Sequence, residues 1–183
     1  MGVSKKILDA SDVRRILGRM ADEIMERHPE TDDLALVGIH TRGVFLAQRI
    51  SSLISKKGPA ALPTGSLDIS LYRDDWTRIT LNPVVHSTSL PFDVDGREII
   101  LIDDVLYTGR TVRAAMDAII DFGRPKRIEL CVLIDRGHRE LPIEANYKGK
   151  FITTSTSEAI NVMLSECDGE DGVEIISSGG DHG

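Results

Sequence analysis

The chain has 183 residues, 41% of them hydrophobic and 28% charged, and carries a formal net charge of −7 at pH 7. This length fits one domain with a sizeable core and is short for two domains of ordinary size. The acidic balance excludes a surface that is positive all over, although it leaves room for a local basic face. No apolar run reaches membrane-spanning length and no signal pattern opens the chain, so we expect a soluble, cytoplasmic protein with no membrane partner.

The first predicted element is an amphipathic helix that begins near Asp9 or Ser11, either of which is a plausible N-cap. Apolar residues recur along it at helical spacing. They are Val13, Ile16, Leu17, Met20, Ala21 and Ile24. The other face carries several arginines, for which solvation is the default interpretation and a binding face the alternative.

Two strands are predicted before the middle of the chain. Residues 34–39 form an apolar run typical of a buried strand, and a turn at 40–43 leads into a helix with apolar positions from Val44 to Ile54. Residues 67–72 alternate between apolar and polar side chains, which predicts a second strand. Periodicity is lost from about residue 73 to 96, and a connection of that length predicts a functional, flexible flap.

The most informative segment is residues 98–119. Four consecutive aliphatic residues precede Asp103 and Asp104, and a turn containing Thr108 and Gly109 then opens a helix. In such a junction, backbone N–H groups and the positive end of the helix dipole meet at one point, which suits a phosphate. The two carboxylates would repel a bare phosphate, so the ligand must also carry hydroxyl groups or a metal ion. A ribose 5-phosphate meets this condition.

Beyond this helix, residues 127–134 form another apolar strand, which runs into Asp135 and Arg136. Strand-like pieces follow around 159–164 and 173–176, and the Gly-rich stretch 179–183 is expected to be disordered. Alternating strands and helices with apolar strand runs predict an α/β fold, in which helices cover both faces of a parallel sheet. We expect one domain over residues 1–178.

Several motifs resemble a known family. The aliphatic run followed by Asp-Asp and Thr-Gly-x-Thr resembles the phosphoribosyl-pyrophosphate (PRPP) signature of the type I phosphoribosyltransferases. Residues 36–43, 68–75, 105–113 and 134–143 resemble the PyrR family of pyrimidine-operon regulators and uracil phosphoribosyltransferases. The last of these stretches, with Asp-Arg-Gly-His-Arg-Glu-Leu-Pro, is the most diagnostic. The resemblance implies a type I phosphoribosyltransferase-like fold with a small hood and a long flap.

The resemblance also implies an activity: transfer of ribose 5-phosphate from PRPP to uracil, which gives UMP and pyrophosphate with the help of Mg²⁺. No direct protein ligand to the metal is expected, since PRPP itself and water-mediated contacts to the two aspartates would hold it. The implied catalytic residues are Asp103, Asp104, Tyr72 and Arg73. The implied PRPP-binding residues are Thr41, Arg42, Gly43, Asp103, Asp104, Val105, Leu106, Tyr107, Thr108, Gly109, Arg110 and Thr111. A cis peptide is expected near the first three.

Asp135 and Arg136 are the implied base-binding residues, with a structural ion pair as the competing interpretation. The family also binds pyrimidine-operon leader mRNA when UMP or UTP is bound, and it forms dimers that pair further. Candidate RNA-binding residues are Arg14, Arg15, Arg19, Arg27, His138, Arg139, Lys148 and Lys150. Asp22 and Glu144 depart from this basic pattern and weaken a phosphate-driven interface.

Two alternatives stay open. The PRPP signature alone also fits a purine or another pyrimidine phosphoribosyltransferase without a role in RNA binding. A nucleotide sensor without turnover is the non-enzymatic alternative.

Overall fold

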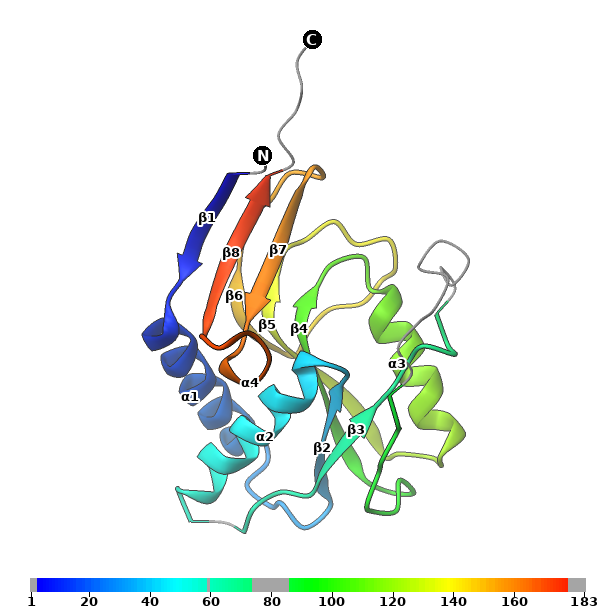
Figure 1. The fold of residues 1–183 in the computed structure, drawn as a ribbon. Coiled ribbons are helices and arrows are strands. Elements are labelled where there is room, and N and C mark those ends of the chain that lie inside the picture. The colour runs from blue at the N-terminus through cyan, green and yellow to red at the C-terminus, as the bar shows by residue number, and fades with distance from the viewer. Residues whose placement is uncertain (1–2, 59, 74–85, 178–183) are drawn as a thin grey trace.

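The computed structural model describes residues 3–58, 60–73 and 86–177. Its strands form a five-stranded sheet in the order β3-β2-β4-β5-β6 and a three-stranded sheet in the order β1-β8-β7 (Figure 1). The strands are β1 Val3–Leu8, β2 Leu34–Ile39, β3 Thr64–Leu67, β4 Glu98–Leu106, β5 Arg127–Asp135, β6 Tyr147–Phe151, β7 Glu158–Met163 and β8 Gly172–Ser177. The helices are α1 Ala10–Arg27, α2 Arg42–Ser55, α3 Arg110–Asp121 and α4 Ser165–Asp168.

The five-stranded sheet is parallel throughout and is covered on both faces. Leu36 and Ile100 face a cluster that includes the apolar sides of α1 and α2. Val37 and Leu101, the next residues along the same strands, face the cluster formed with α3. Figure 1 shows α1 and α2 on one side of this sheet and α3 on the other. Successive side chains of a strand point to opposite faces, so strands buried on both sides need a continuous apolar sequence. The predicted α/β architecture with helices on both faces is confirmed.

The first helix is capped as the sequence indicates. Asp9 is the N-cap of α1; its side chain accepts a hydrogen bond from the backbone N–H of Asp12, whose side chain accepts from the Asp9 N–H in return. The predicted apolar positions of α1 are all buried. This reciprocal capping box fixes where the helix begins, immediately after β1.

The antiparallel sheet β1-β8-β7 forms the small hood and joins the two ends of the described chain. Its strands β7 and β8 were expected, at 159–164 and 173–176. β1 was not, because Ser4, Lys5 and Lys6 are exposed and give it no apolar pattern. The tail expected at 179–183 lies outside the described residues.

The strand predicted at 67–72 is wrong. β3 covers Thr64–Leu67 and ends where the prediction began. After it, the Asp68 side chain accepts a hydrogen bond from the Ser70 backbone N–H at 2.8 Å, and the Tyr72 N–H donates to the Ile69 carbonyl at 2.9 Å. An Asp side chain that binds the backbone two residues on closes a turn and ends the strand. Of the expected flap, residues 74–85 lie outside the described part of the chain.

Candidate active site

The residues predicted to bind phosphate groups, and the predicted pair Asp103 and Asp104, lie at the carboxyl ends of β2 and β4, which are neighbours in the sheet. Ligands of open parallel sheets bind at this edge. Gly43, in the first turn of α2, packs against the end of β4, where a Cβ would collide with the Ile102 carbonyl oxygen. The peptide bond between His40 and Thr41 is cis, as expected for this turn. The close approach of Gly43 to the end of β4 places this turn directly beside Asp103.

The Thr-Gly turn forms the first cavity, of about 380 Å³, which residues 105–112 line together with Arg73 and Glu140. Gly109 is the N-cap of α3 and has a φ of 91°, a left-handed conformation that a glycine adopts without strain. The cavity thus lies at the start of a twelve-residue helix. This arrangement provides the dipole and the exposed N–H groups that an anion needs.

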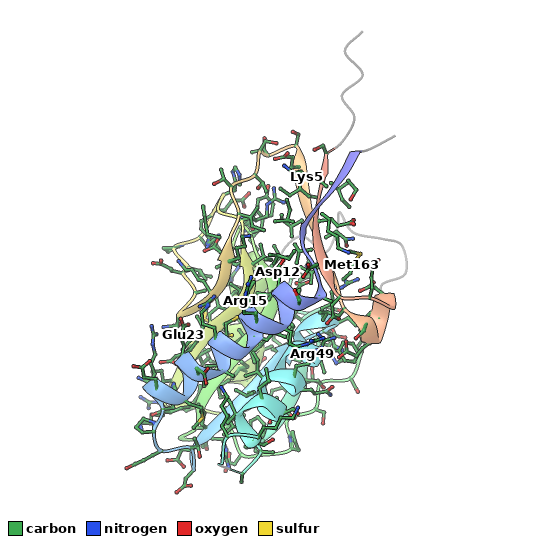
Figure 2. All side chains as sticks on the ribbon, turned by 90° about the vertical axis from the view of Figure 1, so that its left-hand side faces the viewer. Lys5, Asp12, Arg15, Glu23, Arg49 and Met163 are labelled. Carbon is green, nitrogen blue, oxygen red and sulfur yellow. The ribbon has the colours of Figure 1, made fainter. Side chains whose placement is uncertain are left out.

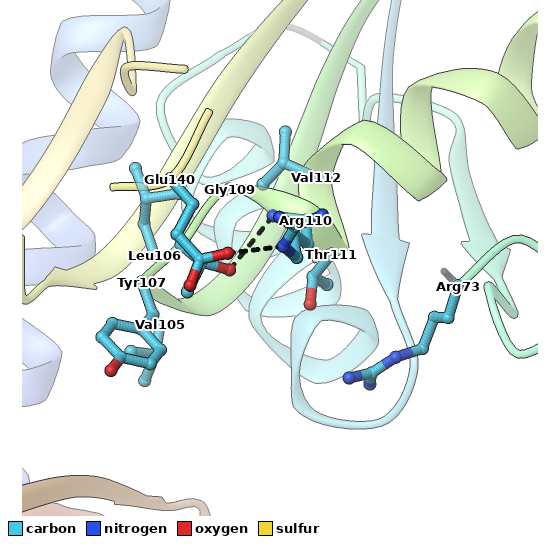
Figure 3. A pocket seen from close by; sticks show the side chains of 10 residues that line it. Arg73, Val105, Leu106, Tyr107, Gly109, Arg110, Thr111, Val112 and Glu140 are labelled. Atoms are coloured by element: carbon cyan, nitrogen blue, oxygen red, sulfur yellow. Dashed lines mark hydrogen bonds and ion pairs between the residues drawn. The ribbon is translucent and has the colours of Figure 1, made fainter. Parts of the chain in front are cut away.

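An ion pair joins two residues that line this cavity. Arg110 Nε donates to Glu140 Oε2 at 2.6 Å, and Figure 3 shows the two side chains joined, with Arg73 on the other side of Thr111. Glu140 was not predicted as a site residue. It lies within residues 134–143, which resemble the PyrR family, but nothing in its spacing shows that it reaches the phosphate turn.

A second cavity of about 400 Å³ adjoins the first, since Arg73, Val105 and Thr111 line both. Thr41, Arg42, Asp103 and Asp104, all predicted, line it. So do His40, Asp68, Ser70 and His86, which were not predicted. Asp68 and Ser70 follow the edge strand β3, so a correct boundary for that strand would have pointed to them. Nothing in the sequence signals His86.

The two aspartates differ in their surroundings. Asp103 is buried and its Oδ1 accepts a hydrogen bond from the Asp104 N–H at 2.9 Å, whereas Asp104 is half-buried. Burial raises the pKa of Asp103 well above its usual range, and the adjacent Asp104 carboxylate adds to this effect. Asp104 is thus the more accessible carboxylate for a polar ligand in the cavity.

Tyr72 and the expected base-binding residues are held by contacts with other side chains. The Tyr72 hydroxyl donates to Asp121 on α3 at 2.7 Å, and Tyr72 lines neither cavity. Asp135 accepts from Arg139 Nη2 at 2.7 Å and lies 3.7 Å from Lys148 Nζ, so its ion-pair partners are Arg139 and Lys148, not Arg136. Arg136 lies with its guanidinium 4.0 Å from the centre of the Tyr107 ring.

The guanidinium of Arg136 also connects the main sheet to the hood. It donates to Thr154 Oγ1 at 3.1 Å and to the carbonyl oxygens of Ser155 and Glu158 at 3.1 and 2.7 Å. Both Asp135 and Arg136 are buried, at 2% and 7% exposure. Their side chains are therefore engaged in protein contacts in this structure.

The candidate RNA-binding residues fall into two groups. Several are held by other parts of the protein: Arg19 Nη2 donates to the Lys148 and Gly149 carbonyls, His138 Nε2 lies 2.7 Å from the Thr154 carbonyl, and Arg139 contacts Asp135. Arg27 lies over the Tyr147 ring, and Lys148 pairs with Glu144. Arg14, Arg15 and Lys150 are exposed, and Figure 2 shows Arg15 beside Asp12 on α1.

The interpretation of Arg19 as a purely solvated surface charge is therefore wrong, because its hydrogen bonds to the Lys148 and Gly149 carbonyls connect α1 to β6. The two carboxylates that depart from the basic pattern both have cationic partners, Lys57 for Asp22 and Lys148 for Glu144. Within the described ranges, no helix is long and apolar enough to cross a membrane.

Comparisons with known proteins also indicate a phosphoribosyltransferase domain. The model of the phosphoribosyl transferase domain matches residues 3–165. The protein named bifunctional protein PyrR from Syntrophobacter fumaroxidans is 55% identical over 172 residues, which are 94% of this chain and 92% of that protein. The protein of the same name from Thermus thermophilus is 54% identical over 175 residues, covering 96% and 97% of the two chains.

Among solved structures, a hypoxanthine phosphoribosyltransferase from Trypanosoma cruzi gives a TM-score of 0.72 at 14% identity, covering 95% of this chain and 91% of that one. One from Staphylococcus aureus gives 0.66 at 19% identity, covering 85% and 80%. At these identities the likeness concerns the fold alone. The sequence matches over nearly the whole chain decide the family: this chain belongs to the PyrR family of the type I phosphoribosyltransferases.

Proposed function

We propose that this protein transfers ribose 5-phosphate from PRPP to uracil and also acts as a uridine-nucleotide-responsive regulator of pyrimidine-operon mRNA. One observation carries the enzymatic part: Asp103 and Asp104 lie between the Thr108–Gly109 turn and the Thr41–Gly43 turn, along two adjoining cavities. PRPP has the same order of groups, with ribose hydroxyls between a phosphate and a diphosphate. Residues 1–178 would serve both roles as one domain.

Each part of PRPP has a proposed position. The 5-phosphate binds the turn at the start of α3, with hydroxyl donors from Thr108 and Thr111. The ribose hydroxyls bind Asp104 and Asp103, and the diphosphate lies at the turn that begins α2. Breaking the anomeric C–O bond places charge on the leaving pyrophosphate, so the protein mainly orients the two reactants and offsets this charge. Arg42 and Arg73 line the second cavity and supply positive charge there.

The donor set also fits Mg²⁺ bound through the substrate. Mg²⁺ prefers oxygen ligands and retains several waters, and two carboxylates at the wall of an open cavity suit such an ion. PRPP would hold it directly, and Asp103 and Asp104 would contact it through water. The ion would neutralise negative charge on the pyrophosphate.

The base end is proposed near Asp135 and Arg136 at the end of β5, beside Tyr107, which directly follows β4. Since both charged side chains already have protein partners, we propose that they recognise uracil mainly by fixing the backbone and the Tyr107 ring. We also propose that Tyr72 takes part in closure of the flap. This movement would require its hydroxyl to break the hydrogen bond to Asp121.

The test incubates the pure protein with PRPP, Mg²⁺ and, separately, uracil, orotate, hypoxanthine and guanine. We expect nucleotide from uracil alone and none after Mg²⁺ is chelated. Product from a purine but not from uracil would identify a purine phosphoribosyltransferase. Binding of UMP without turnover of any base would identify a nucleotide sensor.

For the regulatory part, the exposed Arg14, Arg15 and Lys150 are the proposed phosphate contacts, in a homodimer or a larger assembly of dimers. The candidates that contact other parts of the protein would fix the shape of this surface and also add positive charge to it. They are Arg19, Arg27, His138, Arg139 and Lys148.

A further inference from the structure

Two stacked imidazole rings lie beside the proposed diphosphate position. The ring centroids of His40 and His86 are 4.6 Å apart and the ring planes differ by 5°. His40 follows β2 and precedes the turn that opens α2, and His86 is the first described residue after the gap at 74–85. Both line the second cavity. The stack therefore forms part of the wall that a diphosphate would contact.

One nitrogen of this pair lacks a hydrogen bond. His40 Nε2 is the only buried side-chain nitrogen or oxygen without a partner among the residues that the structure describes. Buried polar atoms of native proteins nearly always have a partner, so an exception calls for a functional explanation. Other atoms of His40 line the cavity, so a charge on this ring would act electrostatically on an anion bound there without a direct contact through Nε2.

The free protein disfavours a charge on this ring. Burial lowers the pKa of His40, and the neighbouring His86 lowers it further. A hydrogen bond with the Ser87 backbone and the Asp68 carboxylate act on this pKa in the opposite direction. The Asp68 carboxylate already accepts hydrogen bonds from Ser70 and from the His86 backbone N–H. The charged groups that line the cavity with the pair are Arg42 from α2, Asp68 and Arg73 from the segment after β3, and Asp103 and Asp104 from β4.

We propose that the His40–His86 pair takes up one proton when the diphosphate of PRPP, or pyrophosphate, binds in this cavity. The proton comes from solvent, joins an imidazole nitrogen and is released when pyrophosphate leaves. A multiply charged anion favours the imidazolium, whereas two stacked cations would repel each other, so one proton is expected for the pair.

This inference rests on the proposed phosphoribosyl transfer and deepens it. Charge accumulates on the pyrophosphate as the anomeric bond breaks, so an imidazolium beside it interacts more strongly in the transition state than with bound PRPP. The pair is thus a binding and charge-sensing element of the same site. It makes PRPP affinity dependent on pH.

The test is calorimetric titration of the intact protein with PRPP and with inorganic pyrophosphate at pH 7, each in two buffers of different ionisation enthalpy. This comparison counts protons directly. The variants are His40→Gln, His86→Gln and the double variant, and His138→Gln serves as the control histidine outside the cavity. Protons exchanged by the ligand itself cancel when wild type and variant are compared.

We expect wild type to take up about one more proton per bound ligand than the double variant, whereas His138→Gln matches wild type. Affinity should also rise by up to about tenfold more per pH unit, as pH falls from about 8 to 6, in wild type than in the double variant. His86→Gln keeps the uptake at His40. Equal proton numbers in wild type and the double variant, even with weaker binding in the latter, would overturn the inference and leave the stack a packing contact.

A second measurement needs no variant. Ring resonances of His40 in wild type, followed by NMR across pH, should show its pKa rising by about two units or more on addition of pyrophosphate, which is the shift that an uptake of nearly one proton requires. An unchanged pKa in the bound protein overturns the inference. If wild type binds neither ligand and converts no uracil, the proposed function fails as well, whereas uracil conversion with equal proton numbers overturns the histidine pair alone.

Discussion

Arg42 and Asp168 form a two-point contact, with Arg42 Nη2 to Asp168 Oδ1 at 2.8 Å and Nε to Oδ2 at 3.3 Å. Arg42 opens α2 beside the proposed diphosphate position, and Asp168 ends the short helix α4 between two strands of the hood. Asp168 Oδ2 also accepts from the Leu164 N–H at 2.9 Å. The hood thus orients an arginine of the site.

Replacing Asp168 with Asn should therefore reduce kcat/KM for PRPP by about tenfold, roughly 1.4 kcal/mol, because Arg42 loses a charge-assisted partner that preorganises it. Glu170→Gln is the matched control, since it removes an exposed carboxylate of the same region that pairs only with Lys6 among the described residues. Steady-state kinetics with varied PRPP measure both variants. An unchanged or higher kcat/KM in Asp168→Asn would show that the contact does not preorganise the site.

Asp104→Asn should impair catalysis far more than folding. Its carboxylate is half-buried at the end of β4 and contributes little packing, but it is the accessible carboxylate of the ribose position. Loss of ribose orientation should cost on the order of 2–4 kcal/mol in transition-state stabilisation. Kinetics together with thermal unfolding of the variant test this. Near-normal activity would place the ribose elsewhere.

The sequence predicts the inner part of the main sheet well and its edges poorly. β2, β4 and β5 are buried on both faces, so their apolar runs identify them. The outer strands β3 and β6 contain Gly65 and Gly149 amid polar residues and give no such pattern. β1 pairs with β8, about 170 residues away, as in the pair Val3 and Ser177, so local sequence carries no signal of it.

The same limit applies to the site. Asp103, Asp104, Thr108 and Gly109 follow one another closely in the chain, and their chemistry is readable from one motif. The stacking of His86 on His40 and the approach of Glu140 to the phosphate turn depend on tertiary packing. No spacing in the sequence encodes these contacts.

At the opposite end of the sheet, Tyr147→Phe should destabilise the protein. The buried Tyr147 hydroxyl donates to Glu129 Oε2 at 2.7 Å and lies 3.1 Å from His28 Nε2. Removing it takes one hydrogen bond from the Glu129 carboxylate, which keeps its contact with His28 Nε2 at 2.9 Å. A lost hydrogen bond to a charged group costs about 1–3 kcal/mol in the free energy of unfolding. Urea unfolding measures the loss, and Tyr72→Phe, whose hydroxyl bond to Asp121 is exposed, is the control. Equal losses in the two variants would contradict this explanation.

The stability of the fold should also depend on Glu98 below neutral pH. Hydrogen bonds from Lys126 and then from Arg127 lower the pKa of Glu98 from 4.5 to about 2, against the opposing effect of burial. A carboxyl whose pKa is lower in the folded state contributes its full stabilisation above the unfolded value, and this is lost as pH falls from about 4.5 towards 2. In Glu98→Gln the unfolding temperature should therefore fall less over this range than in wild type. Glu26 is exposed, so Glu26→Gln should behave as wild type. Identical pH profiles for wild type and the two variants would show that Glu98 does not contribute to the pH dependence of stability.

RNA binding gives the last prediction, and the structure changes which residues test it. Arg19→Gln would break the contacts of α1 with the Lys148 and Gly149 carbonyls, so a loss of RNA binding in that variant has two explanations. Arg14 and Lys150 are exposed and offer a cleaner test. Each phosphate contact releases counterions, so removing one should weaken binding to a pyrimidine-operon leader and lower the slope of log affinity against log salt by about one.

Filter binding over a range of salt, with and without UMP, measures these slopes. We expect salt-sensitive binding that UMP strengthens in wild type, a smaller slope in Arg14→Gln and in Lys150→Gln, and uracil conversion at the wild-type rate in both, since neither residue lines the two site cavities. Lys5→Gln, an equal change of charge on the hood strand β1, is the control and should leave the slope unchanged. If wild type retains no leader RNA at low salt, the pairing of Asp22 and Glu144 with lysines has not rescued the basic face, and the protein acts as an enzyme alone.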